Sequence, residues 1–237
     1  MNHDNFILYP SIGFNDFRKL CKRIKYLIMK YWETEHSIPL AWHEVACGYW
    51  WRYPNPHSQH VFSVDTLDTR LEGDKLYARR LIMKTNPLPS WGKHFFNARK
   101  VAVIEEVEVD RDNHKLVWYT RNIGLQKFMA TVERATLTKN SDEDTTVHKE
   151  CWIESSIVGF RSAIKHFGVE RYKSNCGPAT RGFQMVVEEN LKKQREASSG
   201  IRSKDVCSIS NTSSSGLNIY NSVTRWQCEA EEMVPSD

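Results

Sequence analysis

The sequence lacks the signals of a membrane-spanning chain and of a secreted chain. No apolar run approaches the about 18 consecutive residues that a bilayer-spanning helix needs, and the apolar stretch at residues 24–31 is short and carries Lys25 and Lys30. The first residues also lack the order of positive charge, apolar stretch and small-residue cleavage site that marks a secretory signal. We therefore expect a protein that is soluble or at most peripheral to a membrane.

Short motifs that carry catalytic chemistry are missing too. The chain contains no G-x-S-x-G elbow, no P-loop, no G-x-G-x-x-G after a strand and no H-E-x-x-H. His57 and His60 stand three apart without a nearby carboxylate or cysteine to complete a metal site. Glu105, Glu106 and Glu108 lie on an alternating stretch, where Glu106 and Glu108 should face water instead of acting as paired carboxylates. We expect no catalytic residue, no bound metal and no cofactor.

Cysteine spacing and net charge argue against disulfide bonds, a zinc site and a nucleic-acid ligand. The six cysteines form no C-x-x-C pair and no zinc-like spacing with histidine, which favours reduced or buried thiols over a disulfide framework. The net charge of +4 is milder than the concentrated basic charge of a dedicated nucleic-acid binder, so we expect no nucleic acid. An anionic partner is compatible with this charge. The eight Trp residues suit both a core and a surface that meets lipid.

Composition divides the chain into three zones. Residues 1–28 form a basic leader with apolar residues at helical spacing, and two interpretations stay open. The leader is an amphipathic helix that targets mitochondria or lies on an anionic membrane, or it is disordered and Met29 is an alternative start. Residues 29–195 have the composition of a folded domain. Residues 196–237 are rich in Ser and Asn and should form a disordered tail.

Periodicity in the central zone predicts a helix, a series of strands and a terminal helix. The first helix covers residues 39–50 and ends before Pro54 and Pro56. Alternation predicts strands at 60–69, 76–84, 101–109, 115–122, 128–138 and 146–155. Helical spacing resumes at 160–187, where Gly177-Pro178 should kink or break the helix. Hairpins followed by a helix predict an α+β fold, with an antiparallel sheet covered on one face that can enclose a cavity if it is curved.

Two cations share a predicted strand face with aliphatic residues. Arg80 and Lys84 alternate in phase with Leu76, Ala78 and Ile82. An unpaired buried charge is costly, so each cation should pair with an acid, extend to an edge or meet an anionic ligand.

An apolar stretch joins two of the predicted strands at residues 87–96. Its apolar residues are Leu88, Pro89, Trp91, Phe95 and Phe96, and they surround Lys93 and His94. The stretch predicts either a helix that packs into the core or a mobile lid that contacts a membrane, because Trp and Lys suit a headgroup boundary.

The order of these motifs resembles the PRELI family over residues 29–191. The likeness rests on Arg52-Tyr53-Pro54-Asn55-Pro56, His60-Val61, Ser63-Val64-Asp65-Thr66, Leu88-Pro89-Ser90-Trp91, Glu105-Glu106 and Thr120-Arg121-Asn122. It implies a curved antiparallel sheet of about six to seven strands, covered by helices and enclosing a lipid cavity beneath a long C-terminal helix.

The resemblance implies a lipid-transfer protein of the mitochondrial intermembrane space and no enzyme. Phosphatidic acid is the implied ligand, and phosphatidylserine is the near alternative. Family members act with a small cysteine-paired helical partner and touch membranes transiently. Two other classes stay open, namely a module that binds a partner without transferring lipid and an enzyme that acts on a lipid.

The resemblance also implies a set of headgroup-binding residues. Carried over by position, they are Arg52, His60, Lys84 and Asn175. An arginine fork and a lysine point charge suit phosphate oxygens, and histidine makes affinity mildly sensitive to pH. Where members often carry a basic residue shortly after the position of Asn175, this chain has Gly177-Pro178. Two alternatives follow: Arg171, a weaker candidate one turn earlier, compensates for the missing cation, or the headgroup is bound more weakly.

Overall fold

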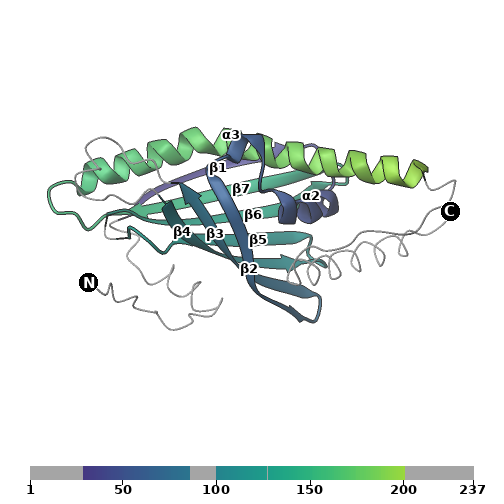
Figure 1. Cartoon of the computed structure of the whole chain (residues 1–237), viewed down its shortest axis with the longest axis horizontal. Coiled ribbons are helices and arrows are strands. Elements are labelled where there is room, and N and C mark those ends of the chain that lie inside the picture. Colours follow the sequence, from purple (N-terminus) through teal and green to yellow (C-terminus); the bar gives the residue numbers. More distant parts are fainter. Residues whose placement is uncertain (1–28, 86–99, 127, 201–237) are drawn as a thin grey trace.

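Alternating inward and outward residues build a curved antiparallel sheet (Figure 1). The computed structural model describes residues 29–85, 100–126 and 128–200. Its strands are β1 (Lys30–Ile38), β2 (Val61–Glu72), β3 (Lys75–Thr85), β4 (Lys100–Asp110), β5 (Lys115–Asn122), β6 (Ala130–Ser141) and β7 (Asp144–Glu154). Its helices are α2 (Trp42–Gly48) and α3 (Arg161–Gly200), with short 3₁₀ helices η1 (Tyr49–Trp51) and η2 (Pro56–Ser58). The described strands follow the order β1-β7-β6-β5-β4-β3-β2, with antiparallel neighbours throughout.

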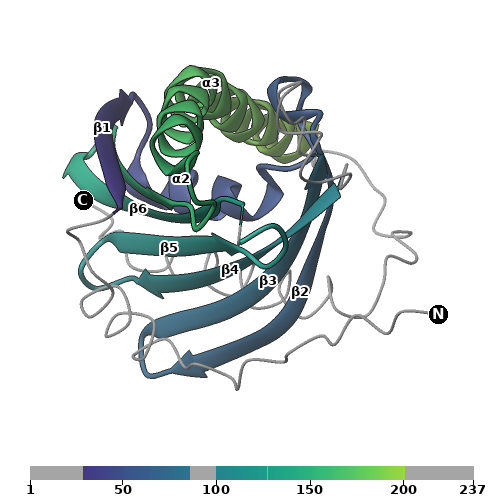
Figure 2. The same ribbon diagram turned by 90° about the vertical axis from the view of Figure 1, so that its left-hand side faces the viewer.

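Both described α-helices lie on the same side of this sheet, which we call the inner face. Figure 2 shows the strands curving beneath α3, so that the helix lies along the concave side of the sheet. The expected α+β fold is therefore confirmed, with a curved antiparallel sheet, a helical cover on one face and a long C-terminal helix.

The strands expected from alternation are confirmed, but the sequence reasoning missed β1. Trp32, Thr34 and His36 point to the less exposed side of β1, while Glu33 and Glu35 face solvent. The alternation is present, yet two of the three less exposed residues are polar, so the segment lacks the apolar period that identifies the other strands. Pairing with β7 along its whole length fixes it in the sheet.

A tight corner leads from α2 into β2. The helix predicted at 39–50 begins at Trp42, because Leu40 N–H donates to Ile38 O (2.8 Å) and turns the chain out of β1. After η1, the Asn55 side chain donates to Arg52 O (2.6 Å) and accepts from His57 N–H (2.9 Å). Pro56 then starts η2, where its missing N–H costs nothing. These contacts fix the segment that carries Arg52.

The terminal helix continues through Gly177-Pro178, so a break at this position is wrong. Figure 1 shows α3 as one bowed ribbon. An interior proline can bend a helix instead of ending it when packing holds both sides, and here Cys176 before it and Phe183 after it are buried. The helix runs to Gly200, so residues 196–200 of the expected tail are helical. Residues 1–28 and 201–237 lie outside the described residues.

The main core fills the space between the inner face, α2 and the second half of α3. Strand residues Leu116, Leu137 and Val147 are fully or almost fully buried there, and Tyr49 and Val187 pack against them from the helical side. Burial of such side chains contributes about 1.5–3 kcal/mol each. This core anchors the second half of α3 to the sheet.

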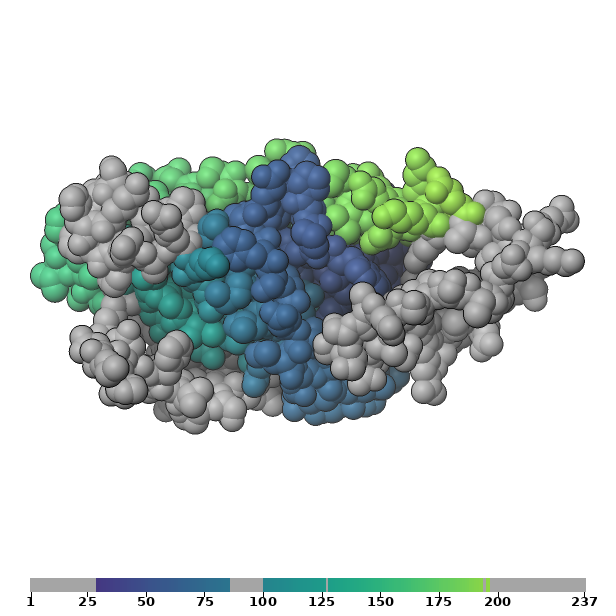
Figure 3. Space-filling model, in the orientation of Figure 1, coloured from purple at the N-terminus to yellow at the C-terminus, as the bar shows by residue number. Residues whose placement is uncertain are grey.

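Close packing between α3 and η2 predicts opposite effects for two glycines of one helix. In Figure 3 the segment around η2 abuts α3, and a Cβ added at Gly182 would lie 2.5 Å from Asn55 Oδ1. We expect Gly182→Ala to reduce the free energy of unfolding by about 1–3 kcal/mol. Gly177→Ala should instead raise it by about 0.5–1 kcal/mol, since its nearest neighbour is the flexible end of Arg181 at 3.4 Å. Urea denaturation of both variants checks this, and a stabilising Gly182→Ala would contradict the packing.

Candidate functional site

Cross-strand register places a row of mostly polar residues across the inner face. Taken along the sheet, this row consists of Trp32, Cys151, Glu133, Thr120, Glu105, Arg80 and Thr66. We call it the polar row. The adjacent row on the α2 side carries Ala78, Val107, Trp118 and Ala135, which belong to the main core. The polar row therefore forms the boundary of that core.

A pocket of about 100 Å³ lies on the other side of the polar row, between the inner face and the first half of α3. Its polar lining residues include His60, Lys84, Thr120, Glu133, Arg171 and Asn175. Figure 2 looks onto this end of the molecule. His60 and Asn175 are exposed, whereas Lys84, Glu133 and Arg171 are half-buried. The pocket thus opens between the start of β2 and α3.

Two apolar clusters wall the pocket. One joins Val61, Ile82, Val101 and Val103 from β2, β3 and β4, with Leu125 packed against it. The other joins Cys151, Ile153 and Val169, with Met129 and Tyr172 packed against it. The site therefore combines charged residues with apolar walls, as a site for an amphipathic ligand requires.

Most of the headgroup residues implied by the sequence converge on this pocket. His60, Lys84, Asn175 and the weaker candidate Arg171 come from η2–β2, β3 and α3, and all of them line it. No hydrogen bond or ion pair reaches the Lys84 ammonium from any residue that the structure describes. Among the described residues, the positive charge of Lys84 therefore has no hydrogen-bond or ion-pair partner.

Burial and then electrostatic repulsion shape the protonation of His60. Partial burial of the ring, and then the charges of Lys84 and Arg171, lower the pKa of His60 below its ordinary value. The imidazole is accordingly neutral near pH 7. A bound anion would offset both cations and draw a proton back to the ring.

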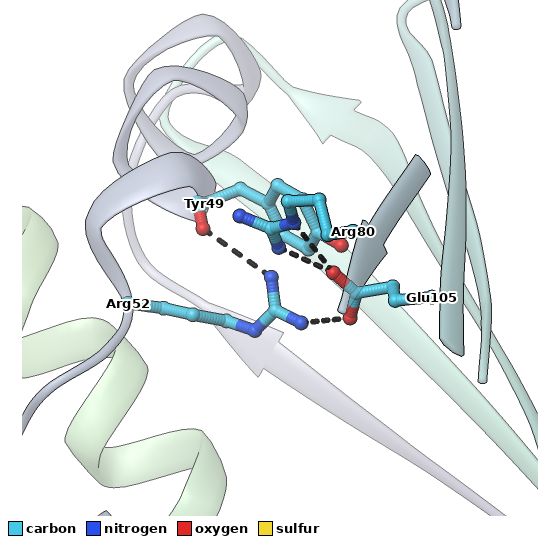
Figure 4. Close-up of polar contacts among 4 residues, drawn as sticks. All are labelled: Tyr49, Arg52, Arg80 and Glu105. Atoms are coloured by element: carbon cyan, nitrogen blue, oxygen red, sulfur yellow. Dashed lines mark hydrogen bonds and ion pairs between the residues drawn. The ribbon is translucent and has the colours of Figure 1, made fainter. Parts of the chain in front are cut away.

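Arg52 is not among the residues that line the pocket. Figure 4 shows its guanidinium and that of Arg80 on opposite oxygens of Glu105. Arg80 Nε donates to Glu105 Oε1 (2.8 Å), and Arg52 also stacks over the Tyr49 ring at 4.0 Å. The exposed fractions of Arg52, Arg80 and Glu105 are 6%, 3% and 0%. Arg52 therefore lies in a buried ion pair shared with Arg80 and not on the pocket lining, so its implied headgroup role stays a prediction.

Arg80 and Lys84, the two cations predicted on one strand face, have different surroundings in the structure. Arg80 pairs with an acid, Glu105, whereas Lys84 faces the pocket. Burial raises the pKa of Glu105, but the two guanidiniums more than offset this and hold it below the ordinary value. The carboxylate is therefore ionised and binds both arginines as one buried ionic cluster.

The expectation that Glu106 and Glu108 face water is wrong. Both are buried on the sheet face opposite α3. Glu106 pairs with Arg79 (3.2 Å), and Glu108 pairs with Lys75 (3.4 Å). Apolar cross-strand neighbours, Tyr119 and Val117, help to cover them. The alternation of the strand is correct, but its second face is not open to solvent at these positions.

Sequence reasoning missed two charged residues near the pocket. Glu133 lines it, and Lys149 lies on the adjacent strand with its ammonium donating to Thr180 Oγ1 (2.7 Å). Burial lowers the pKa of Lys149. Both residues lie in phase with inward-facing apolar residues of their strands, as Arg80 and Lys84 do. This period-two pattern could have placed them on the inner face from the sequence.

Several other expectations fall outside what the structure tests. The expected lid residues Leu88, Pro89, Trp91, Phe95 and Phe96 lie outside the described residues.

In the described ranges, no three His, Cys, Asp or Glu side chains gather where they can hold a metal ion. No helix in the same ranges has an apolar stretch long enough to cross a membrane.

Comparison with known proteins identifies relatives for most of the described region. Residues 43–194 match the family model described as PRELI-like family. The "PRELI domain-containing protein 1, mitochondrial" of Gallus gallus is 37% identical over 164 residues, which are 67% of this chain and 76% of the relative. The Homo sapiens protein of the same name is 35% identical, with 68% and 76% covered. "Protein UPS1, mitochondrial" of Saccharomyces cerevisiae is 27% identical, with 66% and 92% covered.

Proposed function

Because this chain belongs to the PRELI-like family, we propose that it carries phosphatidic acid between the outer and inner mitochondrial membranes. The observation that carries the proposal is the Lys84 ammonium, which has no ion-pair partner among the described residues and lies in a pocket that also holds His60, Arg171 and Asn175. Lys84 and Arg171 supply positive charge, and Asn175 supplies neutral donors. A phosphate group is an anion that fits such a set of donors.

The dimensions of the pocket suit a headgroup better than a whole lipid. Its volume of about 100 Å³ is well below the about 300–1,000 Å³ of sites for drug-sized ligands. Acyl chains would enter between the two apolar clusters as α3 and the sheet separate. Each methylene removed from water contributes about 0.8 kcal/mol, so the chains supply most of the affinity and the cations supply selectivity.

The proposal extends to place and partners. The mitochondrial names of the relatives support a mitochondrial location for this chain, and we place it in the intermembrane space. There it would bind a small cysteine-paired helical protein and touch membrane surfaces transiently. Residues 87–96 would serve as the lid that contacts the membrane.

Lipid transfer between vesicles tests this function. The full chain, purified with its partner, should move labelled phosphatidic acid from donor to acceptor vesicles faster than phosphatidylserine. Native mass spectrometry of the gently purified protein should show one bound phospholipid per chain. Partner binding without bound lipid or transfer would favour a scaffolding module, and faster transfer of phosphatidylserine would favour the alternative carrier. Formation of a product from the bound lipid would indicate an enzyme.

A further inference from the structure

Glu133 is an acid in a pocket of cations. It lies within the polar row, opposite Thr120 on one side and Cys151 on the other. Its side chain lines the pocket with Lys84 and Arg171. No hydrogen bond or ion pair reaches its carboxylate from the described residues. The other carboxylate of the row, Glu105, is bound by two arginines, so Glu133 stands apart from it.

Charged and titratable groups surround Glu133 from every element packed around the pocket. They are Lys149 and Cys151 on β7, Tyr172, Cys176 and Arg171 on α3, Lys84 on β3 and His60 before β2. The negative charge of Glu133 contributes to a raised pKa of Cys151 and Tyr172, after burial as the main cause. Both groups are therefore neutral near pH 7. Lys149 lies diagonally across from Glu133 and supplies a balancing charge.

A carboxylate in this position favours some anions over others. It repels a phosphate that carries two negative charges, because like charges at close range disfavour ionisation. It can accept a hydrogen bond from a phosphate oxygen that keeps its proton, and bonds to charged groups are the stronger kind. A phosphate monoester has such a proton, since its second ionisation lies near pH 6. A phosphate diester has only one ionisable group and no proton left to donate.

We propose that Glu133 accepts a hydrogen bond from the remaining proton of a phosphate monoester, so that the pocket selects a monoanionic lipid monoester over a diester of equal charge. Lys84 and Arg171 would hold the ionised oxygens of the same phosphate from the other side of the pocket. This inference rests on the proposed function and adds a specificity-determining residue to it. No ion pair joins Glu133 and Lys84, so the carboxylate is not there to neutralise the lysine. Acceptance of a hydrogen bond from the phosphate gives it a role.

Two lipids that differ by one methyl group test the inference. Phosphatidic acid and phosphatidylmethanol share acyl chains and a single negative charge at low pH, but only phosphatidic acid keeps a donor. The measurement is the ratio of their transfer rates between neutral vesicles from about pH 5 to about pH 8, on either side of the ionisation near about 6. Titration of His60 or Lys149 affects both lipids and largely cancels in this ratio.

The wild-type ratio should fall about tenfold over this range, which corresponds to about one pKa unit of coupling. In Glu133→Gln the repulsion is absent, so the fall should shrink to about threefold or less. Glu133→Asp keeps the charge but shortens the reach, so its ratio should be low even at the acid end. Phosphatidylmethanol transfer shows that each variant is folded and able to carry lipid.

Several outcomes would overturn the inference. An equal ratio in wild type and both variants, or a wild-type ratio that does not change with pH, would remove Glu133 from headgroup selection. A preference for phosphatidylserine that Glu133→Gln abolishes would assign the carboxylate to an ammonium group instead. Wild-type protein that transfers neither lipid would contradict the proposed function itself. If Glu133→Gln alone does not fold, the Glu133→Asp ratio decides.

Discussion

Lys84→Glu should abolish most transfer of phosphatidic acid while leaving the fold intact. A hydrogen bond to a charged group contributes about 1.5–3 kcal/mol, and each about 1.4 kcal/mol is a factor of ten in affinity. Reversal of the charge adds repulsion, so we expect a loss of about 100-fold or more in the transfer rate. Lys84 has no hydrogen-bond or ion-pair partner among the described residues, so the substitution breaks no ion pair within that part of the chain. Vesicle transfer and thermal unfolding measure the two effects separately.

A distant lysine serves as the matched control for this reversal. Lys192 lies on α3, and its side chain is 79% exposed beside Glu196. Lys192→Glu makes the same change in net charge, but we expect transfer to stay within about twofold, because Lys192 does not line the pocket. Loss of its exposed ion pair should cost at most about 1 kcal/mol of stability. Equal losses in both variants would attribute the effect to attraction of the whole protein to anionic vesicles. Unchanged transfer in Lys84→Glu would refute the headgroup assignment.

Glu105→Gln should strongly destabilise the fold. It leaves the buried guanidiniums of Arg52 and Arg80 without a compensating charge. Removal of one partner from a buried ionic cluster costs about 3–5 kcal/mol, a large part of the about 5–15 kcal/mol that stabilises a typical domain. We expect Tm to fall by roughly 10 °C, measured by circular dichroism near neutral pH.

The pH dependence of this effect has a defined sign. The arginines overcome the effect of burial and hold the pKa of Glu105 below its ordinary value, whereas the unfolded chain should titrate near about 4.3. A lowered folded pKa gives stability that is complete above the unfolded value and is lost as pH falls through the folded value. The difference between wild type and Glu105→Gln should therefore be constant near neutral pH and shrink below about pH 4.

Glu106→Gln provides the comparison on the opposite face of the sheet. Glu106 is also buried, but it pairs with the partly exposed Arg79, and burial raises its pKa. We expect a change of less than about 1 kcal/mol in the free energy of unfolding. Similar losses in the two variants would mean that the cost reflects burial of the side chain and not the charge of the two arginines.

The predictability of the fold followed the strength of each local pattern. Val101, Val103, Val107 and Val109 alternate so regularly that β4 could be predicted almost to its bounds. β1 could not, because Thr34 and His36 interrupt the apolar period, and only pairing with β7 makes it a strand. Local rules also favour a break at Pro178, yet packing of α3 on the sheet overrides them.

The site could be predicted only in part, because its ion pairs depend on the register between neighbouring strands. Alternation placed Arg80 and Lys84 on the inner face, but it could not show which of them meets an acid. That depends on the register between β3 and β4, which sets Arg80 opposite Glu105 and Lys84 opposite Val101. The same holds for Arg52, whose position relative to Glu105 follows from the corner before β2. Residue type alone suggested a phosphate ligand for an arginine that is internally paired.

The polar row divides the molecule into two parts with different mechanical demands. On one side, the main core and the second half of α3 are held by continuous apolar packing. On the other, the first half of α3 covers a pocket between two smaller clusters. Local opening requires the least free energy where buried apolar contacts are fewest. The first half of α3 can therefore move away from the sheet when a lipid enters. The ion-paired part of the polar row and the main core behind it would then remain closed to water.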